Sequence, residues 1–381
     1  MKKLLLATTA VALSAGMASA QVSMSGSARM GIIYNNNIDS GTGSVSGADA
    51  TRNNTAKLQF TSRIRLQFTM SGETDTGLAF GASVRGDQFT NANAGDTGMT
   101  AGSVFIAGEF GRLTFGDVAG GARAAVGDLY GVGLTGLGFL NEVTYLDRTF
   151  SVGAGTRENR RTSVLYQYSI EGFDFFASVG QQRRIDNSDV TTVNNAAVGV
   201  PATERAKDTL YGLGVRYSID GLTLSAGYEA SKDSFTDLAT PANNSKLSAS
   251  HVIIGAEYAI DNFKMKAVAG RVGGDLGTQL GAYQNLSRSH YGVSVSGEFD
   301  ATTVTAFAHR TIQSSTNYGI GASYDLGGGA SLMGGITRQG ATKTPVAPAG
   351  YALPAGVRNG VGGFGETRST TRADFGLNFT F

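Results

Sequence analysis

Hydrophobic and polar residues alternate along most of this chain with a period of two. Over residues 57–70, six of the seven even-numbered positions are apolar and all seven odd-numbered positions are polar. The same alternation occurs over 22–34 and over 371–381. A period of two is typical of β-strands with two different faces, and the length exceeds the usual ~5–6 residues of a globular strand. The pattern therefore predicts an all-β protein with long strands.

Sixteen segments of this kind follow one another along the sequence. Short connections between them carry turn-forming pairs such as Asp220-Gly221, which suit the positive φ angles of tight hairpins. Long polar connections alternate with these turns, so the pattern predicts an up-and-down antiparallel meander. The expected strands are 22–34, 57–70, 78–87, 102–110, 112–117, 161–170, 173–181, 209–219, 222–230, 249–260, 263–272, 289–299, 301–310, 317–325, 330–338 and 371–381.

Two classes of protein use strands with one apolar and one polar face. A soluble sandwich turns the apolar face toward a dry core, whereas an outer-membrane barrel turns it toward lipid and encloses water with the polar face. The even number of segments, their length near the ~9–11 residues that span a bilayer and the segregation of turns from loops favour the barrel. Closure would also pair every strand edge, as lipid requires. We predict a 16-stranded antiparallel transmembrane β-barrel with short periplasmic turns and long extracellular loops.

The first 20 residues resemble a secretory signal peptide. Two lysines follow the initiator methionine, an apolar stretch covers 4–16, and small residues precede Ala20. We expect cleavage between Ala20 and Gln21, which would leave 21–381 as a single barrel domain. Nowhere later does an apolar run reach about 18 residues, so the sequence predicts no transmembrane helix.

Composition and charge exclude several classes of function. Removal of the two N-terminal lysines would change the formal net charge from +1 to −1, which argues against a nucleic-acid partner. The absence of cysteine excludes disulfides and thiolate-bound metals. His251, His290 and His309 fall on expected strands with irregular spacing, and no Gly-x-Ser-x-Gly or His-Glu-x-x-His motif occurs, so we predict neither a metal site nor an enzyme. Glycine is abundant, with 55 residues against 5 prolines, a ratio unlike that of collagen or disordered chains.

Several stretches resemble the trimeric general-diffusion porins of Gram-negative bacteria, in particular the alphaproteobacterial branch typified by the porin of purple photosynthetic bacteria. The most specific stretch runs from Phe60 to Ser83 and contains FTSRIR, TMSGETDTGL and FGAS. Similar strings occur at 28–31, 127–130 and 318–330, and the resemblance covers the whole mature chain, with the loops diverging most. It implies sixteen strands, in agreement with the count above, and a homotrimer in the outer membrane of a Gram-negative bacterium.

The resemblance also implies partners. Phe381 would belong to the carboxyl-terminal signal that the barrel-assembly machinery reads. The barrel would contact outer-membrane lipid and lipopolysaccharide, and ions and small hydrophilic solutes would pass through it by passive diffusion. No cofactor is expected. Loop carboxylates could bind calcium, as in some family members, although no EF-hand spacing is present.

In this family the third long loop folds into the barrel, which would make 118–160 the constriction loop. Alternation places four arginines on the lumen face of the first three strands, where they avoid a cost of roughly 2–4 kcal/mol each in lipid. These are Arg29, Arg63, Arg65 and Arg85, and the facing acids would be Asp117, Asp128, Glu142, Asp147 and Glu158. We expect a transverse field that favours small hydrophilic solutes. The alternative is a substrate-selective channel with a saturable solute-binding site.

Overall fold

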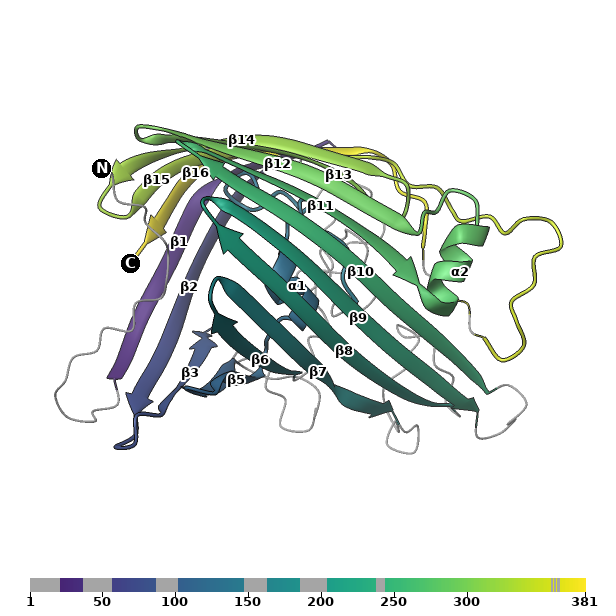
Figure 1. The fold of residues 1–381 in the computed structure, drawn as a ribbon. Coiled ribbons are helices and arrows are strands. Elements are labelled where there is room, and N and C mark those ends of the chain that lie inside the picture. The colour runs from purple at the N-terminus through teal and green to yellow at the C-terminus, as the bar shows by residue number, and fades with distance from the viewer. Residues whose placement is uncertain are drawn as a thin grey trace.

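The computed structural model describes residues 21–36, 57–86, 102–146, 163–185, 204–237, 244–357, 359, 361 and 364–381. Sixteen strands form one closed antiparallel barrel, in which each strand pairs with its sequence neighbours and the first closes on the last (Figure 1). They are β1 (Gln21–Asn35), β2 (Leu58–Glu73), β3 (Ala79–Arg85), β4 (Ser103–Gly108), β5 (Gly111–Gly116), β6 (Ser163–Ile170), β7 (Phe173–Ile185), β8 (Glu204–Ile219), β9 (Leu222–Asp237), β10 (Ser245–Ile260), β11 (Phe263–Gly273), β12 (Ser289–Phe299), β13 (Thr302–Arg310), β14 (Thr316–Gly327), β15 (Ala330–Gln339) and β16 (Thr370–Thr380). The predicted sixteen-stranded meander is confirmed.

Tight turns join the strands at one end of the barrel, which we call the turn end, and the longer connections lie at the opposite loop end. Both central residues of the β8–β9 turn have positive φ, 45° at Asp220 and 81° at Gly221. Glu171 and Gly172 repeat this with 48° and 82°. Such angles match the right-handed twist of the flanking strands, so these pairs form hairpins as the sequence predicts.

The apolar face of the strands points outward. Phe60 is 93 % exposed and Ile64 is 79 % exposed, whereas Arg63 and Arg65, on the other face of β2, are partly buried on the lumen side. A soluble protein rarely exposes large apolar side chains over a continuous surface. The barrel interpretation of the alternation is therefore the correct one, and the polar face encloses the lumen.

The loop end departs from the expected boundaries in two ways. Strands β7 to β10 are longer than predicted; β9 continues to Asp237 instead of ending at 230. The connection expected over 273–288 contains a helix, α2 (Gly274–Ala282). Leu276 and Leu280 lie four residues apart on one helical face and join a buried cluster with Val272. Among the described residues, no helix is long and apolar enough to cross a membrane.

Candidate channel constriction

The described part of the connection after β5, residues 117–146, lies against the inner wall of the barrel; we call it the inner segment. It begins with α1 (Gly121–Val126), whose Gly121 amide donates to Ser178 Oγ of β7 at 2.7 Å. The Tyr130 amide donates to Ser294 Oγ of β12 at 3.1 Å. Further along, the Leu137 carbonyl accepts from Thr337 Oγ1 of β15 at 3.2 Å. The inner segment therefore follows the circumference of the lumen.

Glycines occupy many of the wall positions that the inner segment approaches most closely. A Cβ atom built on Gly227 would lie 2.6 Å from Cβ of Ala122, and one built on Gly292 would lie 2.6 Å from Cδ1 of Leu129. Glycine permits such a close approach because it has no side chain. We call these positions the glycine track: Gly212, Gly214, Gly227, Gly255, Gly292, Gly319, Gly321, Gly335, Gly376 and Gly31. Contact with the inner segment explains part of the high glycine content.

Apolar side chains fill the space between the inner segment and the wall. Leu129 and Leu140 of the segment are 2 % and 1 % exposed, and they share a buried cluster with inward-facing Ile253 and Phe307 of the strands. A barrel interior that faced only water would not contain such a cluster. Burial of this apolar surface holds the segment against one sector of the lumen.

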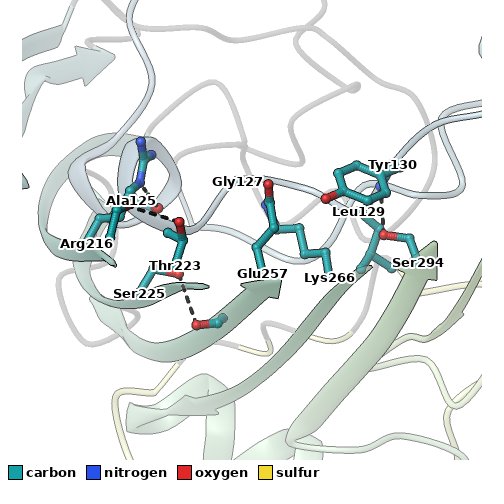
Figure 2. Close-up of polar contacts among 12 residues, drawn as sticks. Ala125, Gly127, Leu129, Tyr130, Arg216, Thr223, Ser225, Glu257, Lys266 and Ser294 are labelled. Atoms are coloured by element: carbon teal, nitrogen blue, oxygen red, sulfur yellow. Dashed lines mark hydrogen bonds and ion pairs between the residues drawn. The ribbon is translucent and has the colours of Figure 1, made fainter. Parts of the chain in front are cut away.

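Two charged side chains of the wall bind the backbone of the inner segment. Asp374 of β16 accepts from the amide of Leu134 at 3.0 Å, and from the amide and hydroxyl of Thr135 at 2.6 and 2.7 Å. Arg216 of β8 donates to the carbonyls of Ala124 and Ala125 at the end of α1 (Figure 2). A cation at a helix C-terminus also interacts favourably with the helix dipole.

The three histidines meet behind the inner segment, although their sequence spacing is irregular. Nε2 of His251 lies 2.9 Å from Nε2 of His290, so one ring donates to the other, and the His309 ring packs edge-on against His290. A side chain at Gly270, on the strand between β10 and β12, would collide with the His251 and His290 rings. Within the described ranges, no group of three or more histidines and acids has the geometry to hold a metal.

Glu229 connects this histidine group to the inner segment. One carboxylate oxygen, Oε2, accepts from the Leu146 amide at 2.8 Å and lies 3.2 Å from Nδ1 of His251. Glu229 and His251 are 1 % and 0 % exposed. Buried polar groups need such partners, and the pairing fixes the far end of the described inner segment. Sequence reasoning missed Glu229 because nothing local distinguishes it from other inward-facing polar residues.

The four predicted arginines lie on adjacent strands and face the lumen. Arg29 of β1 is directly opposite Arg63 of β2, and Arg65 is two residues further along β2. Arg85 of β3 is opposite Gln67, so it lies diagonally across from Arg65. We call these four side chains the basic wall. Nη1 of Arg29 also donates to the Leu134 carbonyl at 3.3 Å, which brings the inner segment to one edge of this wall.

The predicted acids are placed less uniformly. Asp128 forms an ion pair with Arg123 at 2.6 Å and accepts from the Val143 amide at 3.0 Å, so its carboxylate closes the inner segment on itself. Asp117 directly follows β5, and Glu142 follows Leu140 by two residues. Asp147 and Glu158 lie outside the described residues, as does Ala20, whereas Gln21 begins β1. A pore-lining role for these acids stays a prediction.

A pair of charged wall residues, Glu257 and Lys266, was also missed by sequence reasoning. The pair lies beside the part of the inner segment that follows α1. Glu257 of β10 and Lys266 of β11 are directly opposite each other and form an ion pair at 3.7 Å. Figure 2 shows them close to Gly127 and Tyr130 of the inner segment. Burial raises the pKa of Tyr130 above its ordinary value of 10, and the nearby Glu257 carboxylate raises it further, so the phenol is neutral.

A closed sixteen-stranded barrel with an apolar exterior, charged side chains on its inner face and a segment packed against its inner wall defines the class of membrane diffusion channels. The chain belongs to the Gram-negative porin family, whose model matches residues 7–344. It is 32 % identical over 334 residues to a porin of Rhodobacter capsulatus, across 83 % of this chain and 93 % of the relative. The protein is accordingly an outer-membrane diffusion channel for ions and small hydrophilic solutes.

Solved structures agree with this assignment. A porin structure refined at 1.8 Å has a TM-score of 0.61 and 27 % identity, and the match covers 95 % of this chain and all of that one. A triple mutant of the Rhodopseudomonas blastica porin has a TM-score of 0.51 at 18 % identity over 95 % of this chain and 100 % of that one, and so supports the fold.

Proposed function

We propose that solutes cross the barrel through a charged constriction bounded by the inner segment on one side and the basic wall on the other. The observation that carries this proposal is the position of the segment's contacts. Its hydrogen bonds to the wall reach β7, β8, β9, β12, β15, β16 and β1. Arg63, Arg65 and Arg85 belong instead to β2 and β3. The water-filled path then runs past these arginines.

Charge reversal of the basic wall tests this proposal. In planar bilayers under a salt gradient, Arg63→Glu/Arg65→Glu should shift the reversal potential toward cation preference, because four formal charges change next to the path of the ions. A matched control is Lys343→Glu/Arg368→Glu, which makes the same charge change at two exposed loop residues. An unchanged permeability ratio in the Arg63/Arg65 variant would remove these arginines from the constriction.

The proposal extends to maturation and assembly. Residues 1–20 are removed, the loop end faces the cell exterior, and 21–381 forms a homotrimer in contact with lipid and lipopolysaccharide. Phe381, whose side chain is 78 % exposed at the turn end, then serves recognition by the assembly machinery. Intact mass spectrometry of the purified protein tests the cleavage, because a chain that begins at Gln21 has a defined mass. A heat-modifiable trimer on mild detergent gels tests the oligomeric state.

A further inference from the structure

Four buried polar side chains lie on the inner wall behind the far end of the inner segment. They are Glu229, His251, His290 and His309, and we call them the histidine latch. They come from four strands, β9, β10, β12 and β13, and each is at most 1 % exposed. All 3 histidines of the chain are members of this group. Histidine changes its charge near neutral pH, so the charge of the latch depends on pH in a range where most other side chains do not titrate.

The hydrogen bonds of the latch fix the positions of its protons. A carboxylate only accepts hydrogen bonds, so Nδ1 of His251, which lies 3.2 Å from Oε2 of Glu229, carries a hydrogen. Nε2 of a neutral His251 is then an acceptor, and His290 donates to it from its own Nε2 at 2.9 Å. Nδ1 of His290 is left with a lone pair and has no hydrogen-bond partner among the described residues. Both ring nitrogens of His309 also lack a partner there, so the neutral latch contains two buried sites that can accept a proton.

The carboxylates that face the latch are already engaged. Glu229 accepts from both His251 and the Leu146 amide. On the inner segment, Asp128 acts electrostatically on His309 but is paired with Arg123 at 2.6 Å. The titratable side chain of Tyr145 meets His251 with its ring edge, at 5.9 Å between the ring centroids. The inner segment therefore covers the latch with groups that are apolar or already paired.

The surrounding wall adds no charge that could balance a proton. The described wall positions opposite the latch are uncharged: Gly212 on β8, Val272 and Gly270 on β11, Gly292 on β12 and Asn317 on β14. Toward the turn end, the next inward-facing charges of β10 and β11 are Glu257 and Lys266, which pair with each other at 3.7 Å. Asp275 of α2 binds β10 through two hydrogen bonds. Within the described structure, a proton taken up by the latch thus adds a buried charge with no free carboxylate beside it.

We propose that the histidine latch is acid-labile: it holds the far end of the inner segment at neutral pH and releases that end when His290 and His309 bind protons. A buried charge without a partner is costly, and the cost disappears when water reaches the charge. Leu140 and Tyr145 belong to the buried apolar cluster beside the latch. Movement of 140–146 away from the wall is therefore the change that admits water to the rings.

The pH dependence of this release follows from proton linkage. Histidine in water titrates near pH 6.5. A histidine that is neutral while the segment is docked and charged after release shifts the equilibrium toward release by up to about tenfold per pH unit below that value. His290 and His309 together give up to about 100-fold per pH unit. His251 is not counted, because the Glu229 carboxylate stabilises its charge in the docked state as well.

Hydrogen exchange in the purified, mature channel in detergent tests the latch directly. Mass spectrometry follows the amides of 140–146 at about pH 7, 6 and 5, a range that lies above the titration of carboxylates near pH 4. The protection factor, corrected for the pH dependence of the chemical exchange, measures the equilibrium between docked and released segment. In the parent it should fall by up to about 100-fold from about pH 6 to about pH 5. His290→Gln/His309→Phe, which keeps a donor toward His251 and a ring at the second position, should retain its protection.

Two comparisons make the result specific to the latch. The amides of β2, which is paired with β1 and β3, should respond to pH equally in the parent and the variant. His309→Phe alone removes one proton site and no hydrogen bond to a described residue, so its protection should fall by only up to about tenfold over the same step. Conductance like that of the parent at neutral pH shows that each variant has folded. Unchanged protection in the parent from about pH 6 to about pH 5, or an equal loss in parent and double variant, would overturn the proposal.

Conductance in planar bilayers separates failure of the latch from failure of the proposed constriction. An effect on conductance rests on the proposed function, in which the inner segment bounds the path of the solutes. Single-channel conductance of the parent should fall together with the protection, because the released end enters this path, and it should stay constant in His290→Gln/His309→Phe. Loss of protection without loss of conductance would leave the latch in place and contradict the constriction. Loss of conductance without loss of protection would contradict the latch.

Discussion

Replacement of Gly227 by valine should force α1 away from the barrel wall. A Cβ atom at this position would lie 2.6 Å from Cβ and 2.7 Å from Cα of Ala122, whereas carbon atoms in contact are about 3.5–4.0 Å apart. One of the two elements must therefore move by about 1 Å. Strand β9 is paired along its length with β8 and β10, so the short helix is the element that yields.

Overpacking of this kind costs about 1–3 kcal/mol. That range corresponds to a change of about 5- to 150-fold in the equilibrium between the docked and the displaced helix. The absence of cysteine allows a direct assay. A thiol introduced by Ala124→Cys, on α1, should react faster with a small maleimide in the Gly227→Val background. Single-channel conductance should fall, because a helix displaced from the wall moves into the water-filled path.

Gly365→Val is the matched control, since no atom lies within 4 Å of a Cβ built on Gly365 and its backbone is not in the positive-φ region. This substitution should leave both the labelling rate and the conductance of the Ala124→Cys channel unchanged. If Gly227→Val also labelled and conducted like its parent, α1 would not be held against β9. The explanation of the glycine track would then be wrong.

Substitutions at three further sites, two of them with a matched comparison variant, probe the other contacts of the chain. Asp374→Ala removes three hydrogen bonds from the inner segment and should lower the free energy of unfolding by at least about 2 kcal/mol in denaturant titrations. Thr337→Ala, which removes one hydrogen bond between neutral groups, should lower it by about 1 kcal/mol. Glu229→Ala leaves the buried Leu146 amide without its acceptor and should cost about 1–3 kcal/mol; Glu229→Gln, which keeps an oxygen there, should cost less in the same titration. Phe381→Ser should reduce the amount of channel assembled in cells but leave refolding into detergent micelles unchanged, and a matching refolding defect would contradict a recognition role.

The strands could be predicted where their two faces meet different solvents. β2 alternates strictly because one face meets lipid and the other meets water. The alternation stops at residue 230 of β9, while the strand continues over 231–237, where Phe235 is the one apolar residue. A strand needs an apolar face only where it crosses the membrane. The length of the alternating stretch therefore matches the thickness of the bilayer and not the full length of the strand. For this reason the strands β7 to β10 are longer than the hydrophobic pattern predicts.

Contacts inside the barrel could not be predicted from local sequence. Asp374 and Thr135 are 239 residues apart, and their contact depends on ring closure and on the path of the inner segment together. His251 and His290 meet because the strand register places them on either side of β11, opposite Val272 and Gly270, and Gly270 has no side chain to separate the rings. By contrast, the direction of Arg63 and Arg65 follows from alternation alone, since Ile64 lies between them and Leu66 follows, both on the apolar face.

Inward-facing residue types divide the ring of strands into two sectors. Glycine on β8 to β10, β12 and β14 to β16 admits the inner segment, and arginine on β2 and β3 faces the remaining lumen. β1 carries both types, because Gly31 lies under the Leu134 side chain while Arg29, two residues earlier, donates to the Leu134 carbonyl. This strand therefore lies at the edge of the sector that the inner segment fills. A side chain at Gly31 would collide with the backbone of β16 at Phe375 and with the Leu134 side chain, so this one glycine permits both the closure of the barrel on β16 and the close approach of the inner segment.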